Sequence, residues 1–188
     1  LKLLRATIPS TIEIMTDIAP DTGTIMADST QIHQVLMNLF TNARHAIGEK
    51  GGNIAVSLLP VNLGATKTAA PPGLQPGRYV KLVLIDDGCG MDAFTAKQVF
   101  EPYFTTKEKG VGTGMGLAMV HGIVKNHGGG IRVTSEVGKG TRFDILFPII
   151  DAKVAEVSAP SKTVSPKGKE RILLVDDDPE FLSLLSDF

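Results

Sequence analysis

Apolar and polar positions recur along this chain with spacings that predict alternating strands and helices. Short apolar runs predict strands at residues 12–16, 54–59, 79–86, 131–135 and 141–147. Recurrence every three or four residues predicts helices at residues 29–47, 93–100 and 116–127. The last two strands are expected to pair as a hairpin. Helices gathered on one face of a mostly antiparallel sheet give an α+β fold, a two-layer α/β sandwich.

The first helix carries two stripes of different character. Asp28 and Gln31, three positions apart, are close to a capping box at its start. Asn38, Asn42 and His45 form a polar stripe, about 100° around the helix from the apolar one at 3.6 residues per turn. This polar stripe is either a solvated face or a row of amide oxygens aimed at Mg²⁺ and its phosphates. The apolar stripe is expected to be buried, and consists of Ile32, Leu36, Leu39, Ala43 and Ile47.

A carboxylate ends the third strand and is followed by a glycine-containing turn. Asp86 comes directly after the apolar run 80–85, and Gly88 and Gly90 follow it. A carboxylate at the mouth of a cleft accepts from the exocyclic amine of adenine, and glycines let the base approach the main chain. An ordinary turn after a strand uses the same residue types. Thr141, which opens the last strand, either brings a hydroxyl to the base or belongs to a plain hairpin.

Residues 110–117 are rich in glycine and lead into the last helix. Bare backbone N–H groups and a helix start favour phosphate binding, whereas the alternative is a mobile glycine hinge. In the preceding segment, Tyr103 and Phe104 are expected to anchor a loop. Lys107 and Lys109 are either cations that a closing lid brings to a phosphate or solvated loop lysines.

Composition limits the classes of function. The formal charge of −1 gives no electrostatic case for nucleic acid or membrane partners. A single cysteine, Cys89, fits a reducing compartment, and no apolar run approaches the roughly 18–20 residues of a membrane span. A cytoplasmic location is expected, with the parent protein either soluble or membrane-anchored. Residues 60–77 are predicted to be a long surface loop, and residues 151–169 a flexible linker.

Five segments occur in a characteristic order, at residues 38–43, 86–90, 100–107, 112–117 and 138–141. They resemble the asparagine box, first glycine box, phenylalanine box and later glycine boxes of sensor histidine kinases, which belong to the GHKL superfamily. The resemblance covers about residues 8–148. It implies the Bergerat-type ATP-binding fold, shared with gyrase, MutL and heat-shock chaperones, and it implies ATP and Mg²⁺ as cofactors.

The resemblance also assigns roles to residues. It implies that Asn42 binds Mg²⁺, that Asp86 binds adenine, and that residues 112–117 wrap the phosphates as a lid. Many such kinases have a lysine where this chain has His45, so a phosphate contact of His45 would depend on pH. The complete set of implied nucleotide contacts is Asn38, Asn42, His45, Asp86, Gly88, Gly90, Met91, Thr106, Lys107, Gly112, Thr113, Gly114, Met115, Gly116, Leu117 and Thr141.

The end of the chain carries a second resemblance. Residues 171–179 are similar to the first strand of response-regulator receiver domains, in which an acidic pair, here Asp176 and Asp177, binds Mg²⁺. The chain stops before a phosphoacceptor aspartate, so this metal site is incomplete. The parent therefore resembles a hybrid histidine kinase. The expected divisions are the end of a dimerisation and phosphoacceptor region (1–9), the ATP-binding catalytic domain (10–150), the linker (151–169) and a truncated receiver domain (170–188).

These resemblances imply an ATP-dependent phosphotransferase of two-component phosphorelay signalling. The domain would hold Mg-ATP so that the γ-phosphoryl group faces a histidine on a separate helical-hairpin domain of the same, homodimeric parent. None of the four histidines of this chain is expected to accept the phosphoryl group, so no catalytic residue is assigned within it. A receiver domain, in cis or on a separate response regulator, would be a further partner. The alternatives are an ATP-driven clamp of the gyrase/MutL type and a non-catalytic nucleotide-binding scaffold.

Overall fold

The computed structural model describes residues 5, 8–64, 71, 73–106 and 112–150, all within the unit Leu1–Lys153. The strands are β1 (Ile12–Ile18), β2 (Gly52–Leu63), β3 (Gly77–Asp86), β4 (Gly130–Glu136) and β5 (Gly140–Pro148). The helices are α2 (Ser29–Ile47), the 3₁₀ helix η1 (Gly48–Lys50), α3 (Ala93–Gln98) and α4 (Gly116–Asn126). The predicted elements are therefore all present, and α3 ends two residues before its predicted end.

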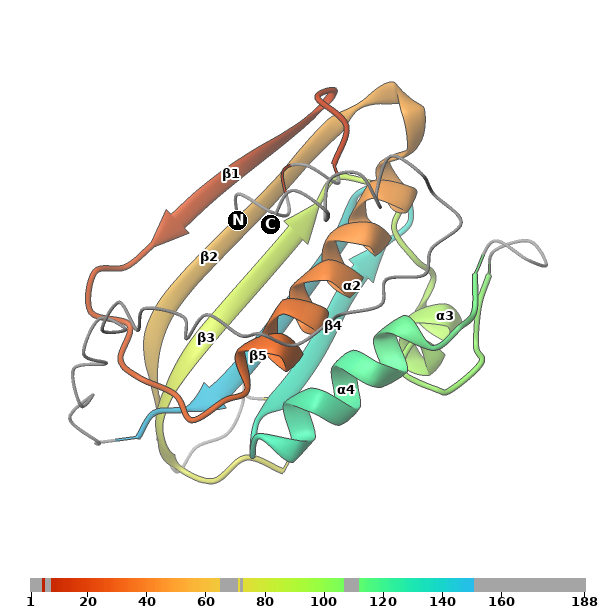
Figure 1. The fold of residues 1–188 in the computed structure, drawn as a ribbon. Helices are drawn as coiled ribbons and strands as arrows, with labels where there is room; N and C mark the ends of the chain where they lie inside the picture. The colour runs from red at the N-terminus through yellow and green to blue at the C-terminus, as the bar shows by residue number, and fades with distance from the viewer. Residues whose placement is uncertain (1–4, 6–7, 65–70, 72, 107–111, 151–188) are drawn as a thin grey trace, which may run out of the picture. The chain divides into compact units, whose positions relative to one another are not determined.

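The strands form one sheet in the order β1-β2-β3-β5-β4. β1 is parallel to β2, and the remaining neighbours are antiparallel, including the predicted hairpin of β4 and β5. Figure 1 shows α2, α3 and α4 on the same side of this sheet. The main hydrophobic core lies between these two layers and contains Leu39 and Val120 from the helices and Leu84 and Ile145 from the sheet. This arrangement confirms the predicted two-layer α/β sandwich.

The start of α2 is capped differently from the prediction. Asp28 is the N-cap residue and accepts a 2.8 Å hydrogen bond from the N–H of Thr30. The amide of Gln31 donates to the Asp28 carboxylate at 3.4 Å, so it does not accept from the Asp28 N–H as a capping box requires. The Asp28 N–H instead donates to Nε2 of His127, the residue that caps the end of α4, at 3.3 Å. The two helices are thereby joined at this end.

The buried stripe of α2 is wider than the sequence pattern indicated. Leu39 and Ala43 are buried as predicted, whereas Ile32, Leu36 and Ile47 are partly buried and pack against the core. The prediction missed Val35 and Phe40, which are 0% and 1% exposed. The face of α2 that packs on the sheet therefore includes Val35 and Phe40 as well as the predicted stripe.

The prediction of a surface loop over residues 60–77 is wrong at both of its ends. Pro60 pairs with Val80 inside the β2–β3 ladder, and β2 continues to Leu63. The C=O of Leu58 accepts from the segment that follows β1, and Pro60, two residues later, points its nitrogen to the same side, beyond the end of β1. A proline is tolerated there because no neighbouring strand requires its missing N–H. Leu74 is buried against Tyr79 and Leu146 in a second small cluster.

Candidate functional site

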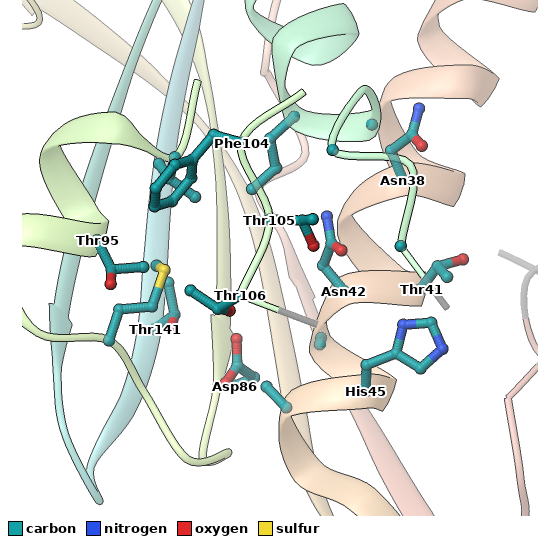
Figure 2. A pocket seen from close by; sticks show the side chains of 18 of the residues that line it. Asn38, Thr41, Asn42, His45, Asp86, Thr95, Phe104, Thr105, Thr106 and Thr141 are labelled. Atoms are coloured by element: carbon teal, nitrogen blue, oxygen red, sulfur yellow. The ribbon is translucent and has the colours of Figure 1, made fainter. Parts of the chain in front are cut away.

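A cavity of about 400 Å³ opens between α2, the turn after β3, α3 and the segments on either side of residues 107–111. It collects most of the site residues predicted from the sequence (Figure 2). Those that line it are Asn38, Asn42, His45, Asp86, Gly90, Met91, Thr106, Gly112, Thr113, Gly114, Gly116, Leu117 and Thr141.

The polar stripe of α2 forms one wall of the cavity. Figure 2 shows Asn38, Asn42 and His45 following one another along the helix, with Asn42 pointing toward the segment of Thr105. The amide nitrogen of Asn38 donates to the C=O of Gln34 at 3.0 Å. Within the described part of the chain, no hydrogen bond engages the side chain of Asn42. The two asparagines therefore differ, because the whole amide of Asn42 is available to a ligand.

Asp86 and Asp87 are consecutive carboxylates with different surroundings. Asp86 is 3% exposed, lines the cavity and accepts from the N–H of Gly88 at 3.0 Å. Burial raises the pKa of Asp86, although hydrogen bonds from the backbone of Gly88 and Thr141 oppose this effect. Asp87 points instead to β2, where the backbone and side-chain N–H groups of Asn53 both donate to it at 2.8 Å. These bonds lower the pKa of Asp87. Only the first carboxylate of the pair faces the cavity.

The glycines after Asp86 have a packing role that the sequence did not show. Gly88 does not line the cavity, and a Cβ at this position would lie 2.6 Å from the carbonyl carbon and the Cβ of Ala46. The N–H of Cys89 donates to the C=O of Ala46 at 2.9 Å. Gly90 has φ +66°, and a Cβ there would collide with the C=O of Glu136. Both glycines therefore let the turn pack against α2 and the β4–β5 hairpin, and Gly90 also lines the cavity.

The glycine-rich segment joins the phenylalanine-containing segment at one point. The N–H of Tyr103 donates to the C=O of Gly114 at 3.1 Å, and Gly114 has φ +66°. The prediction that Tyr103 anchors the loop is wrong for its side chain, which is 76% exposed. Phe104 lines the cavity, whereas Met115 does not and is 43% exposed. The predicted cations Lys107 and Lys109 lie outside the described residues.

Gly116 begins α4 against the asparagine wall. A Cβ at this position would lie 2.9 Å from the side-chain oxygen of Asn38. The unpaired N–H groups at the start of α4 are thus at the edge of the cavity, on the side opposite Asp86 (Figure 2). The cavity has an anionic end at Asp86 and an end suited to anions at α4.

Several lining residues were not predicted. None of them was among the predicted nucleotide contacts, and they are Thr41, Ala43, Ala46, Cys89, Thr95, Val99, Phe104, Thr105 and Phe143. Thr41 was within reach of sequence reasoning, because it precedes Asn42 on the same helix. Thr95 and Val99 could be placed only once α3 was packed against β4. Asp176 and Asp177 lie outside the described residues.

The described residues contain no group of three or more His, Cys, Asp or Glu side chains placed to hold a metal ion. A hard cation in this cavity would therefore take its ligands from amide oxygens such as that of Asn42, from water and from a bound phosphate chain. The donor set fits Mg²⁺, which takes few groups from the protein in nucleotide sites. No helix of the described chain is long and apolar enough to cross a membrane.

Comparison with known proteins gives consistent matches. Residues 27–151 match the family model described as histidine kinase-, DNA gyrase B-, and HSP90-like ATPase. The sensor kinase CckA of Brucella abortus is 39% identical over 184 residues, which cover 94% of this chain and 19% of that protein. The sensor histidine kinase ZraS of Escherichia coli O157:H7 is 41% identical over 125 residues, covering 66% of this chain and 23% of that protein.

Solved structures show the same fold. The mycobacterial sensor histidine kinase MprB superposes with a TM-score of 0.61 at 26% sequence identity, covering 78% of this chain and 87% of that chain. The present chain spans about a fifth of the length of the two curated relatives, at 19% and 23%.

Proposed function

Because this chain belongs to the histidine kinase-, DNA gyrase B-, and HSP90-like ATPase family, we propose that its cavity binds Mg-ATP and holds the γ-phosphoryl group for transfer to a histidine on another domain. The observation that carries the proposal is the pairing of a buried carboxylate, Asp86, with the unengaged amide of Asn42 in one cavity. A purine amine donates to the first, and a phosphate-bound cation takes an oxygen from the second.

The two ends of the cavity suit the two ends of the nucleotide. Asp86 can only accept hydrogen bonds when it is ionised, as an exocyclic amine requires. Gly112, Gly114 and the start of α4 offer backbone N–H groups to the phosphates. His45, on the wall of α2, adds a contact to the phosphates whose strength depends on its protonation. The remaining predicted contacts that line the cavity complete this assignment.

Phosphoryl transfer asks the protein mainly for position and charge neutralisation. Mg²⁺, when bound, neutralises charge on the phosphate oxygens, and Asn42 is the residue that would hold it. Asp86 fixes the base, so that the length of the nucleotide determines where the terminal phosphate lies. The backbone donors of residues 112–116 restrain the phosphate chain. The attacking imidazole comes from a separate helical-hairpin domain, and the chain supplies no phosphoacceptor histidine of its own.

The whole protein is proposed to be a sensor histidine kinase of a two-component phosphorelay. This rests on relatives that are named as sensor kinases and are several times longer than the present chain. We propose a homodimeric parent, a cytoplasmic location for this domain, and a receiver domain as the next partner, in cis from residue 170 or on a separate response regulator. Asp176 and Asp177 would contribute to the metal site of that receiver domain.

The test combines this chain with a separately prepared acceptor hairpin from its parent and ATP labelled in the γ-phosphate. The proposal predicts label on a histidine of the hairpin, stable in base and labile in acid, that requires Mg²⁺. The Asn42→Ala variant should transfer far less, whereas Asn62→Ala, a matched change on β2 outside the cavity, should leave transfer unchanged. An unlabelled hairpin under conditions that saturate ATP binding would refute the kinase assignment. Label on a histidine of this chain would refute the assignment of the acceptor to another domain.

A further inference from the structure

A row of three polar side chains crosses the sheet under the cavity. Asp86 on β3 is the register partner of Thr141 on β5, which is in turn the partner of Ser135 on β4. Partners in an antiparallel pair place their side chains on the same face of the sheet, so all three lie on the helix side. Asp86 and Thr141 line the cavity, and Figure 2 shows them at its floor. Ser135 is half-buried behind them and does not line the cavity.

The hydroxyl of Ser135 makes three hydrogen bonds, and counting protons fixes their directions. The N–H of Met91 donates to Ser135 Oγ at 2.8 Å. The C=O of Gly140 lies 2.9 Å from the same oxygen, and a carbonyl can only accept, so the single Ser135 proton goes there. The third contact, 3.0 Å to Thr141 Oγ1, must then be donated by Thr141. The proton of Thr141 therefore points at Ser135, which leaves the lone pairs of Thr141 to the cavity.

We infer that Ser135 is a positioning residue for base selectivity. Because Ser135 accepts the proton of the Thr141 hydroxyl, the Thr141 oxygen can only accept hydrogen bonds from a ligand in the cavity. The inference rests on the proposed nucleotide binding. The floor of the cavity then presents two side-chain acceptors next to each other, a carboxylate and a hydroxyl oxygen. The inference places both acceptors opposite the substituent at position 6 of the purine. The two hydrogens of a 6-amino group can serve both acceptors, whereas the carbonyl oxygen of a 6-oxo purine has no hydrogen to give them. Ser135 thus helps to reject the oxo base without touching it.

Loss of Ser135 has a specific consequence in this scheme. In Ser135→Ala the Thr141 hydroxyl loses its acceptor and can rotate to donate into the cavity. It can then satisfy a 6-oxo group, so the rejection of that base weakens. One neutral hydrogen bond corresponds to a factor of about three to ten in the ratio of affinities for ATP and ITP. A merely structural role for Ser135 would weaken both nucleotides by the same factor.

The experiment measures affinities of ATP and ITP with Mg²⁺ by calorimetry for the wild-type chain, Ser135→Ala, Thr141→Val and the double variant. Ser135→Ala is expected to lower the preference for ATP about three- to tenfold. Thr141→Val removes the hydroxyl, and adding Ser135→Ala to it should change the preference no further. Ser135→Thr, which restores a hydroxyl, should recover the preference. Ser57→Ala, a serine-to-alanine change on β2, is the control and should match the wild-type chain.

The outcomes separate this inference from the proposed function. Equal weakening of ATP and ITP by Ser135→Ala overturns the inference and leaves nucleotide binding intact. An effect of Ser135→Ala on the preference that persists in the Thr141→Val background also overturns it, because the effect would then not pass through Thr141. A wild-type chain that binds neither nucleotide overturns the proposed function itself.

Discussion

Replacing Asp86 by asparagine tests the base end of the site with almost no change in volume. The wild-type carboxylate is 3% exposed and receives N–H groups from Gly88 and Thr141. Asparagine has one oxygen and one NH₂ group in place of two oxygens. If its oxygen keeps the bond from Gly88, its NH₂ group faces either the N–H of Thr141 or the amine of the base. In both cases a donor faces a donor.

The expected loss follows from that count. A hydrogen bond to a charged group in a buried site contributes about 2–3 kcal/mol, which corresponds to an affinity for ATP lower by about 30- to 150-fold. Asp87→Asn is the matched control, because the Asp87 carboxylate is bonded to Asn53 and faces away from the cavity. Calorimetric titration of both variants with ATP and Mg²⁺ measures the difference. Unchanged affinity in Asp86→Asn, or an equal loss in Asp87→Asn, would refute the placement of the base.

The wild-type chain and the Asp86→Asn variant also allow a test of the pH dependence of ATP affinity. Burial raises the pKa of Asp86, so the carboxylate takes up its proton at a higher pH than an ordinary aspartate. The ratio of wild-type to Asp86→Asn affinity should be highest where Asp86 is ionised. It should fall as pH decreases through the raised pKa of Asp86, since the neutral acid loses the charge-assisted bond. Protonation of the phosphates or of His45 affects both proteins and cancels in the ratio. A ratio that does not change with pH would contradict an ionised Asp86 as the acceptor.

Three further changes probe the metal, the turn and the helix junction. Asn42→Ala should lower ATP affinity about ten- to hundredfold with Mg²⁺ and remove the benefit of adding Mg²⁺, and an undiminished effect of Mg²⁺ would place the metal elsewhere. Gly140→Ala should destabilise the fold by about 3 kcal/mol in chemical denaturation, because its Cβ meets the C=O of Asp86 at φ +98°. Gly138→Ala, at φ +77° with open space around it, should cost only about 1 kcal/mol, and similar costs for the two would argue against the clash. His127→Phe removes the hydrogen bonds to Asp28 and Ile123 and should lower the free energy of unfolding by about 1–2 kcal/mol. His33→Phe, on the exposed face of α2, is the control and should lower it little. Equal effects of the two changes would show that the contact between the two helices does not stabilise the fold.

Sequence reasoning succeeded where the signal is local. The bounds of α2 follow from its cap residue and its periodic apolar positions, and the polar stripe of Asn38, Asn42 and His45 does face the cavity. The sequence left two alternatives for Thr141, a hydroxyl near the base or a plain hairpin position, and Thr141 lines the cavity. These features need only the period of a helix or the end of a strand, which are properties of neighbouring residues.

The failures involve contacts between distant segments. Pro60 was interpreted as part of a loop, because a proline has no N–H for a sheet ladder. The sequence does not show that β1 ends before Pro60, so that no neighbouring strand requires that N–H. The glycines after Asp86 suggested access for a ligand. At Gly88, however, the structure shows that the close approach of Ala46 on α2 leaves no room for a side chain. The N–H of Asp28 is capped by His127, 99 positions away, which no capping-box pattern contains. Each depends on tertiary packing.

The most direct measurement of the central claim uses Cys89, the single cysteine of the chain, which is exposed and lines the cavity. The rate at which a thiol reagent modifies Cys89 is therefore expected to respond to a ligand that fills this cavity. As ATP is added with Mg²⁺, the rate should fall with increasing occupancy, and half of the decrease should occur at the Kd that calorimetry gives. If calorimetry shows that ATP binds to the same sample and the rate of Cys89 modification does not change, the account is contradicted.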